Sequence, residues 1–242
     1  MTLLNPRAGR ILGWAALAAL AVLAVFGLWV APPDRVQSDA QRLMYLHVPS
    51  AWIAYLAFGI TALASALYLW RRTRSPVWDR LAASSAELGV LFTGFTLVLG
   101  SLWGRPVWGV WWAWDARLVT TAVLFFLYVG YLALRQVPTS LEARAKRSAI
   151  AALVAFVDVP IVYGSVSWWR SLHQTPTITA GRTYVHGSMA WTLLLGFVAF
   201  TLVYAWLVAH RYHLSLLETR EESEGLELAI AARRAEAKEV AA

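Results

Sequence analysis

The sequence predicts an all-α integral membrane protein that forms a bundle of six transmembrane helices. Of its 242 residues, 59% are hydrophobic and only 14% are charged, and the mean hydropathy is +0.55. Soluble domains are typically about 45–50% apolar and about 25% charged. The apolar residues form continuous runs rather than an alternating pattern. Since only helices and closed barrels satisfy the backbone within a bilayer, these runs predict helices.

Six runs approach the roughly 20 apolar residues that a membrane span needs. They cover residues 11–31, 51–70, 81–102, 118–134, 148–166 and 187–209. The first run is too long for the core of a signal peptide and is followed by a poor cleavage site, so we interpret it as a retained span. We therefore expect one six-span membrane domain over residues 1–209.

Basic residues are unevenly divided between the two ends of these spans. Fifteen of the 21 lysines and arginines flank one end of the predicted bundle. The other six are Arg35, Arg42, Arg105, Arg117, Arg170 and Arg182. The positive-inside rule makes the more basic end cytoplasmic. We expect a multi-pass protein of a bacterial inner membrane with both termini in the cytoplasm, and this placement explains the net charge of +7 without nucleic acid as a partner.

The last part of the chain, residues 210–242, is polar rather than apolar. Acidic residues come first and basic residues last, an order that complements a helix dipole. They are Glu218, Glu221, Glu222, Glu224 and Glu227, followed by Arg233, Arg234 and Lys238. We expect a solvated cytoplasmic helix that the chemistry of the protein does not require.

Two carboxylates lie inside predicted spans, where a charge is costly and often functional. Glu87 is near the inner boundary, so a snorkelling side chain and a contact with a partner subunit are equally reasonable. Asp158 is near mid-depth, beside Pro160, which should kink the helix. Its carboxylate either accepts hydrogen bonds freed by the kink or contacts a neighbouring subunit.

The segment between the third and fourth spans is the most distinctive stretch of the chain. Residues 103–118 read WGRPVWGVWWAWDARL and hold five of the 14 tryptophans. Pro106 suits the first position of a helix. From there, Trp108, Trp111, Trp112 and Asp115 are spaced i, i+3, i+4 and i+7, so they would share one face of a helix. We expect a short helix lying flat on the membrane, with a surface of indole rings that ends in a carboxylate.

A simple aromatic belt at the membrane boundary is one interpretation of this stretch. A belt does not require five indoles within so few positions, nor Gly104, Gly109, Asp115 and Arg117 among them. A platform for a large, flat, apolar ligand with charge at its edge accounts for both features. Haem is such a ligand, and Arg117 and Arg105 offer guanidinium groups that pair well with propionates. An Asp115–Arg117 structural pair is the alternative.

This stretch closely resembles the tryptophan-rich WWD signature of membrane haem-handling proteins in cytochrome c maturation. The size of the chain and its flanking histidines resemble the haem exporter protein C branch of that family, and the resemblance covers residues from about 44 to about 208. It implies a haem platform. The platform residues are Trp103, Gly104, Trp108, Gly109, Trp111, Trp112, Trp114, Asp115 and Arg117.

Two histidines on the same side as this platform are the candidate axial ligands of haem iron. His47 stands in Tyr45-Leu-His47-Val-Pro49, which is similar to the Y-x-H-V-P context of a ligand histidine in the family. His173 is similar to the second ligand histidine, in a W-W-x-x-L-H-Q context. A lone histidine is more often a satisfied polar group than a ligand. Two of them beside one aromatic surface predict a bis-imidazole haem site.

Other residues near this predicted site have secondary roles. Trp168 and Trp169 add two indoles on the same side, together with Arg105. His186 is a spare outer histidine to which we assign a structural role. His210 and His213 fall on the inner side and should not reach this haem.

Several kinds of chemistry are excluded by what the sequence lacks. It has no cysteine, which excludes thiol–disulfide exchange, iron–sulfur ligation and covalent haem attachment through C-x-x-C-H. It has no P-loop pattern and no H-E-x-x-H pattern, so neither ATP hydrolysis nor zinc-protease chemistry is expected. We therefore expect a binding and transfer protein without catalytic residues, whose energy coupling comes from a partner.

The family resemblance implies a specific function. The protein would hold haem b non-covalently at the periplasmic face and deliver it to a periplasmic haem chaperone. It would act within a haem-export ABC transporter complex, beside an ATPase subunit, a membrane subunit and a small single-span accessory subunit. One alternative is a haem lyase or synthetase component that ligates haem to apocytochrome c, although such proteins are usually larger. Another is a permease for a different flat amphiphile such as a quinone.

Overall fold

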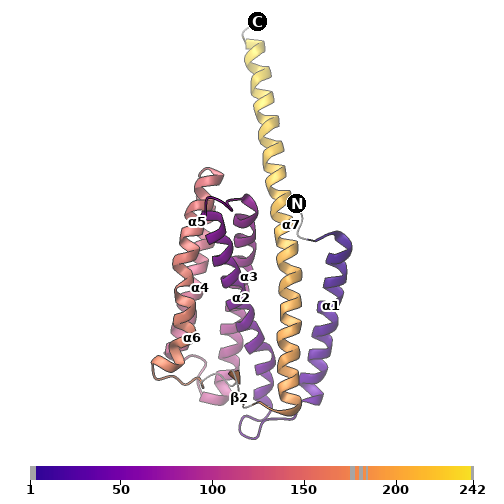
Figure 1. Cartoon of the computed structure of the whole chain (residues 1–242), viewed down its shortest axis with the longest axis vertical. Coiled ribbons are helices and arrows are strands. Elements are labelled where there is room, and N and C mark those ends of the chain that lie inside the picture. The colour runs from indigo at the N-terminus through magenta and orange to yellow at the C-terminus, as the bar shows by residue number, and fades with distance from the viewer. Residues whose placement is uncertain (1–3, 175–177, 180–181, 184, 241–242) are drawn as a thin grey trace.

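The computed structural model describes residues 4–174, 178–179, 182–183 and 185–240. It is an all-helical bundle in which six helices, or pairs of consecutive helices, are long and apolar enough to cross a membrane, as predicted (Figure 1). The helices are α1 (Pro6–Val25), α2 (Met44–Leu69), α3 (Pro76–Trp108), α4 (Ala116–Gln136), α5 (Leu141–Phe156), α6 (Asp158–Trp168) and α7 (Gly187–Val240). A π-helical turn, Phe26–Val30, extends α1, and a 3-10 turn, Asp39–Leu43, precedes α2.

Local sequence signals set the starts of four helices. A side-chain oxygen caps the first turn of each, and these capping residues are Asn5, Ser75, Asp115 and Ser140. Pro6 and Pro76 occupy the first helical positions of α1 and α3, where a missing N–H costs nothing. These caps place the helix starts at Pro6, Pro76, Ala116 and Leu141, two to seven residues before the predicted spans at 11, 81, 118 and 148.

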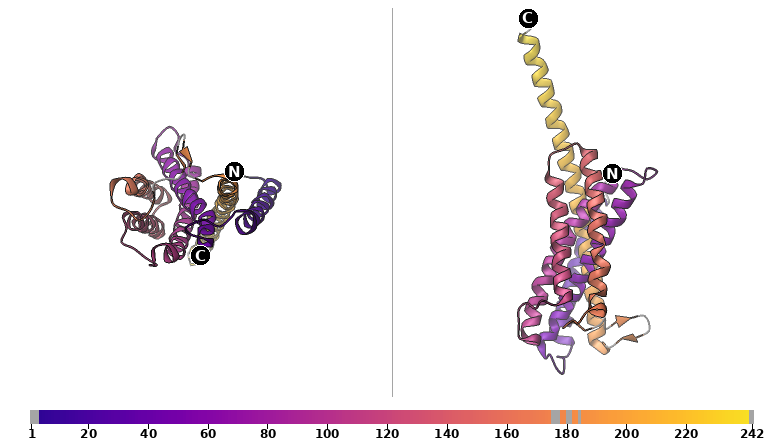
Figure 2. Two further views of the ribbon diagram at one scale, coloured as in Figure 1. Left: turned by 90° about the horizontal axis from the view of Figure 1, so that it is seen from below. Right: turned by 90° about the vertical axis from the view of Figure 1, so that its left-hand side faces the viewer.

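The helices α2 and α3 form the centre of the bundle. One buried cluster joins α2 and α3 to α7, with Ile53, Phe92 and Phe200 among its members. A second joins α2 to α4, where the rings of Phe58 and Tyr128 stack with centroids 3.7 Å apart. Seen along the bundle, α1 and α7 lie on one side of this centre and α5 and α6 on the other (Figure 2).

The fifth span is divided at Val157, so the predicted kink is present. Pro160 has no N–H with which to bond the carbonyl of Phe156, and α5 ends at that residue. Asp158, just after the break, is buried, and its Oδ2 has no hydrogen-bond partner in the described part of the chain. That oxygen therefore does not take up a hydrogen bond freed at the kink.

Glu87 forms an ion pair within the bundle, a contact that the sequence did not predict. The Arg211 guanidinium of α7 binds the Glu87 carboxylate of α3 through two bonds, from Nε to Oε2 and from Nη2 to Oε1, the latter 3.0 Å long. Arg211 also contacts Glu218 at 3.1 Å. The carboxylate therefore has a counter-ion from its own chain.

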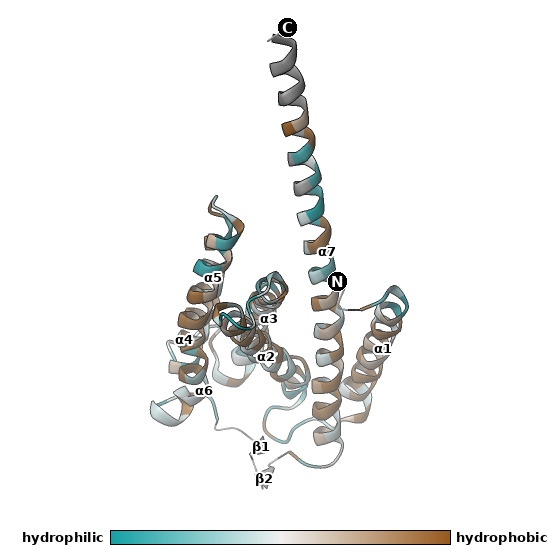
Figure 3. Ribbon diagram, turned by 45° about the horizontal axis from the view of Figure 1, so that its top comes forward, coloured by the Kyte–Doolittle hydropathy of each residue, from teal (hydrophilic) through white to brown (hydrophobic). Residues whose placement is uncertain are grey.

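The two ends of the bundle differ in character. We call the end that the sequence predicts to be cytoplasmic the inner end and the other the outer end. The inner end comprises the start of α1, the α2–α3 and α4–α5 connections and the extension of α7, which lie at the top of Figure 1. The outer end comprises residues 31–43, 109–115 and the connection from α6 to α7. Figure 3 shows apolar helices between the two ends and a hydrophilic extension of α7. Residues 210–240 are helical, as predicted for the tail.

A small feature of the outer end was not anticipated from the sequence. Strands β1 (Ile178–Thr179) and β2 (Arg182–Thr183) pair antiparallel, with Ile178 opposite Thr183. They lie in the connection between α6 and α7, near the segment that carries His173.

Candidate functional site

The tryptophan-rich segment is not the flat helix that its spacing predicts. Helix α3 continues through Pro106 to Trp108, and Gly109 then ends it in the left-handed conformation, with φ of 80°. The Gly109 N–H donates to the Arg105 carbonyl at 3.1 Å, which is a normal helix C-cap. Residues 110–115 are not helical. The i, i+3, i+4 geometry is lost because glycine turns the chain after the first of the four residues.

This turn divides the five tryptophans into two groups. Trp103 and Trp108 remain on α3 and line a cavity. Trp111, Trp112 and Trp114 lie beyond the turn and are 57%, 37% and 87% exposed. The single indole surface predicted over Trp108, Trp111 and Trp112 is therefore absent.

A cavity of about 520 Å³ opens at the outer end, between α2, α3, α7 and the segment after α6. Its size is within the range of roughly 300–1,000 Å³ that is usual for small-molecule sites. A smaller cavity of about 110 Å³ shares several of its lining residues. Both are lined by four of the predicted site residues, namely His47, Trp108, Arg117 and His173. Trp103 and Gly104 line the larger one.

The first turn of α2 places His47 at this cavity. Its ring meets Trp103 edge to face, with centroids 5.7 Å apart. A Cβ at Gly100 would come within 3.0 Å of the His47 ring, so glycine at that position provides the space for the imidazole. The His47 Nδ1 is buried and has no hydrogen-bond partner among the described residues. Buried polar atoms normally have a partner, so this nitrogen is an exception in the wall of the cavity.

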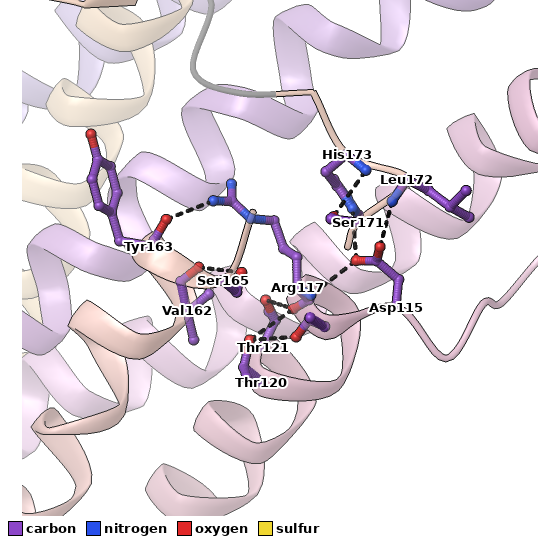
Figure 4. Close-up of polar contacts among 11 residues, drawn as sticks. Asp115, Arg117, Thr120, Thr121, Val162, Tyr163, Ser165, Ser171, Leu172 and His173 are labelled. Carbon is purple, nitrogen blue, oxygen red and sulfur yellow. Dashed lines mark hydrogen bonds and ion pairs between the residues drawn. The ribbon is translucent and has the colours of Figure 1, made fainter. Parts of the chain in front are cut away.

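Asp115 holds His173, which lines the same cavity, and Figure 4 shows their contact. The Asp115 Oδ1 lies 3.1 Å from the His173 Nδ1 and accepts the Arg117 N–H at 2.9 Å. Its Oδ2 accepts the Leu172 N–H at 2.6 Å. One buried carboxylate thus caps α4, holds the segment after α6 and orients the imidazole. The His173 ring also packs against Trp108, with centroids 4.8 Å apart.

Electrostatics define the protonation of this pair. Burial lowers the pKa of His173 below its usual value, and the neighbouring Asp115 carboxylate only partly opposes this effect. Burial acts to raise the pKa of Asp115, but hydrogen bonds from Leu172, Ser171 and Arg117 hold that pKa below its usual range. At neutral pH the carboxylate is charged and the imidazole is neutral. The His173 Nδ1 then carries the proton, and its Nε2 keeps a free lone pair, as in a metal-binding histidine held by a carboxylate.

Arg117 supplies the cation of the cavity. Its Nη2 donates to the Tyr163 carbonyl at 3.0 Å, and its Nε is buried without a partner in the described part of the chain. Figure 4 shows the guanidinium directed towards Tyr163 and away from Asp115. The alternative of an Asp115–Arg117 side-chain pair is therefore wrong, because the carboxylate binds only the backbone N–H of Arg117.

The secondary residues lie outside the walls of the cavity. Arg105 stacks over Trp111 with a separation of 6.0 Å and donates to the Gly109 carbonyl. Trp168 and Trp169 are exposed at the end of α6, with ring centroids 5.9 Å apart. His186 is exposed just before α7.

Some wall residues were not found from the sequence. Gln37 accepts a hydrogen bond from the Trp103 indole N–H at 2.9 Å. Trp52 and Tyr55 of α2 also line the cavity. Tyr55 lies two turns after His47 on the same face of the helix, and this helical spacing could have indicated it.

Comparisons with known proteins identify the family of the chain. The family described as heme exporter protein C matches residues 2–227. A ccmC-like mitochondrial protein of cytochrome c biosynthesis from Marchantia polymorpha is 38% identical over 182 residues, which cover 75% of this chain and 76% of the relative. Heme exporter protein C of Bradyrhizobium diazoefficiens is 37% identical over 203 residues, covering 82% and 76%. That of Escherichia coli is 39% identical over 181 residues, covering 71% and 72%. The chain, a multi-pass membrane protein, therefore belongs to the heme exporter protein C family of cytochrome c biosynthesis.

Proposed function

We propose that this protein binds haem b non-covalently in the outer cavity and delivers it to a periplasmic haem chaperone. The observation that carries the proposal is the convergence of His47 and His173, from α2 and from the segment after α6, on one cavity. Haem iron accepts an imidazole on each face of the porphyrin. The outer end is then the periplasmic end, as the distribution of basic residues predicts.

The donor set suits haem better than a bare metal ion. Among the described residues, no group of three or more His, Cys, Asp and Glu side chains could hold a metal ion. A protein zinc site uses three or four side chains, whereas a porphyrin supplies four nitrogen ligands of its own. Two imidazoles, two indoles and one guanidinium therefore match an iron porphyrin with anionic propionates.

Each residue of the cavity has a defined part in holding the ligand. His47 and His173 are the axial ligands, and Asp115 positions His173 through its Nδ1. Trp103 and Trp108 provide apolar contact with the macrocycle, and Arg117 pairs with a propionate.

The exposed indoles extend this site towards water. Trp111, Trp112 and Trp114, with Gly109 at the turn and Arg105 beside them, form an apolar and cationic rim at the membrane boundary. Exposed apolar patches of this kind mark interaction surfaces. We assign this rim to the contact with the chaperone, with Trp168 and Trp169 as further exposed indoles at the same end.

Membership of the heme exporter protein C family suggests the partners. The chain has no nucleotide-binding motif, so energy coupling comes from the ATPase and membrane subunits of a haem-export ABC transporter, joined by a small single-span accessory subunit. A haem lyase role would require a covalent product on apocytochrome c. A quinone permease would need no axial imidazole at all.

Absorption and resonance Raman spectra of the purified protein test the proposal. We expect six-coordinate, low-spin haem in the wild-type protein, and a five-coordinate or weakly ligated iron in His47→Ala and in His173→Ala. Added imidazole should partly restore each spectrum by filling the vacant position. The matched control is His186→Ala, at the same end of the bundle but outside the cavity, which should leave the spectrum unchanged.

Two results would contradict the proposal. If both single variants keep the wild-type spectrum while His186→Ala loses it, the ligand assignment is wrong. If the protein carries no haem but binds a quinone, the haem function itself is wrong.

A further inference from the structure

A second cavity of about 520 Å³ lies at the inner end of the bundle, between α1 and α7. Its walls carry the same kinds of side chain as the outer cavity. They include two indoles, one guanidinium and two imidazoles, from Trp14, Trp206, Arg10, His210 and His213. None of these residues takes part in the site described above. The two cavities lie at different positions along α7.

His210 is bonded through one ring nitrogen. Its Nδ1 lies 2.8 Å from the carbonyl oxygen of Trp206, one helical turn earlier. Because a carbonyl oxygen can only accept, the Nδ1–H donates this hydrogen bond, and the Nε2 is the ring nitrogen left for a ligand. Asp115 occupies the Nδ1 of His173 in the same way at the outer end.

The contact of each histidine with an indole is also repeated. The His210 ring meets Trp206 with centroids 4.9 Å apart and an angle of 62°, and His173 meets Trp108 at 4.8 Å and 70°. Each pair consists of an imidazole with a free Nε2 and a tryptophan at its edge, facing a cavity of the same size.

Two glycines of α1 leave room for this arrangement. A Cβ on Gly13 would come within 2.8 Å of the Trp206 Nε1, and one on Gly9 would lie 3.9 Å from the His210 Cε1. Gly9 and Gly13 are four residues apart, as are Trp206 and His210, so each glycine faces one of the two rings. The absence of side chains on α1 thus lets the indole lie close and keeps the cavity open next to the imidazole.

We propose that this inner cavity is a second haem site, which receives haem at the cytoplasmic end of the bundle. It rests on the proposed function, because the ligand class is the one assigned to the outer cavity. The His210 Nε2 ligates the iron, Trp14 and Trp206 contact the macrocycle, and Arg10 pairs with a propionate. An anionic phospholipid headgroup would also pair with Arg10, but it has no metal ion that an imidazole nitrogen could ligate.

The two sites differ in coordination. His210 and His213 are three residues apart on one helix, so they approach a haem from the same side. The two axial positions of haem iron lie on opposite faces, so only one of these imidazoles can ligate a given haem. The inner site therefore yields five-coordinate iron, in contrast to the six-coordinate iron of the outer site. A single axial ligand holds haem less tightly than two, which favours transfer from the inner to the outer site.

The two sites are separated along the bundle. From Phe197, which lines the outer cavity, to His210, which lines the inner cavity, helix α7 rises about 20 Å. One haem cannot touch both sites, so each must be occupied separately.

The test is a hemin titration of the full-length protein in detergent, read by resonance Raman spectroscopy. H47A/H173A removes both outer imidazoles, and H47A/H173A/H210A removes the inner one as well. The matched control is H47A/H173A/H186A, since His186 is exposed at the outer end. We expect an iron–histidine stretch of five-coordinate, high-spin haem in H47A/H173A and in the control, and its loss in H47A/H173A/H210A. H47A/H173A/H213A should keep the signal.

An iron–histidine signal that survives the loss of His210 would overturn the inner haem site. The site is also overturned if H47A/H173A binds no hemin and native mass spectrometry finds a phospholipid that Arg10→Gln releases. Failure of the outer haem site would give a different result, since the wild-type protein and H47A/H173A would then have the same spectrum. His210 is exposed, so its replacement by alanine should not prevent folding, and size-exclusion profiles check this.

Discussion

Asp115 shows how much of the outer site depends on one side chain. Its two oxygens accept two backbone N–H groups and contact the imidazole of His173. One carboxylate therefore caps α4, binds the segment after α6 and contacts the proposed ligand histidine. Arg117, two residues later, sends its guanidinium to the cavity instead of to this acid. The acidic and basic groups of the motif therefore have separate functions, one positioning a ligand residue and the other supplying charge.

We expect Asp115→Asn to weaken haem binding. An amide can replace only one of the two acceptor oxygens, so either the Leu172 N–H or the His173 Nδ1 loses its partner. Loss of the residue that orients a metal-bound histidine typically costs about 10–100-fold in affinity. Hemin titration measures the effect, and the midpoint potential of the bound haem should shift as well. Asp39→Asn, which alters an exposed carboxylate at the same end, is the control. Equal affinities for Asp115→Asn and the wild-type protein would refute the positioning role.

Arg117 should matter more for haem than Arg105. Replacing Arg117 by Gln removes a charged hydrogen-bond donor from the cavity, at a cost of about 1.5–3 kcal/mol. Lys in its place keeps the charge but loses the planar fork, so an intermediate affinity is expected. Arg105→Gln is the matched change outside the cavity walls and should alter hemin affinity little. A larger loss from Arg105→Gln than from Arg117→Gln would contradict the assignment of the cation.

At the scale of elements, the junction between α3 and α4 shapes the site. Gly109 stops α3 one residue after Trp108, and Asp115 starts α4. The five residues between them carry the three exposed tryptophans to the rim. The break in the fifth span at Val157 has a comparable effect, because α6 then carries Tyr163 to the guanidinium of Arg117.

Gly109→Ala should destabilise the protein, whereas Gly130→Ala should not. The left-handed conformation at Gly109 costs an L-residue roughly 1–2 kcal/mol. Gly130 lies within α4 with nothing close to the position of a new Cβ, so alanine there should stabilise the helix by about 0.5–1 kcal/mol. Thermal unfolding in detergent, followed by tryptophan fluorescence, compares the two. Unfolding temperatures that shift in the same direction would argue against a strained turn at Gly109.

At the scale of the whole molecule, polarity is divided along the bundle axis. The basic connections and the hydrophilic extension of α7 share the inner end, and the cavity with the exposed tryptophans is at the outer end (Figures 1 and 3). The ion pair of Glu87 with Arg211 joins α3 to α7 close to the inner end. This division of charge determines the orientation that we expect in the membrane.

Topology reporters should place the outer end in the periplasm. A fusion after Leu134 and one at the C-terminus should report a cytoplasmic location, and one near Gly109 a periplasmic location, because the basic end stays inside. Alkaline phosphatase and green fluorescent protein activities, measured for the same fusion sites, provide opposite readouts. A periplasmic C-terminus would reverse the side on which both proposed haem sites lie.

The six spans, the kink at Pro160 and the helical tail could be predicted because each depends on a short stretch of chain. Hydropathy over about 20 residues, capping side chains and proline act locally. The sequence also predicted that His47, Trp108, Arg117 and His173 belong to one haem site, chiefly through its resemblance to a known haem-handling family. The structure brings these four to one cavity, although their role in haem binding stays a prediction.

The sequence alone did not determine which residues contact one another. The i, i+3, i+4 spacing of the tryptophans favoured a helix, but the left-handed turn at Gly109 ended it. Asp115 lies 58 residues before His173 and Glu87 lies 124 residues before Arg211, so neither partner was visible in a local pattern. Such contacts form only when helices distant in the chain pack side by side. Local sequence therefore determined the spans and their order, whereas tertiary packing decided the contacts, because a buried polar group such as the Asp115 carboxylate is stabilised by partners from another segment of the chain.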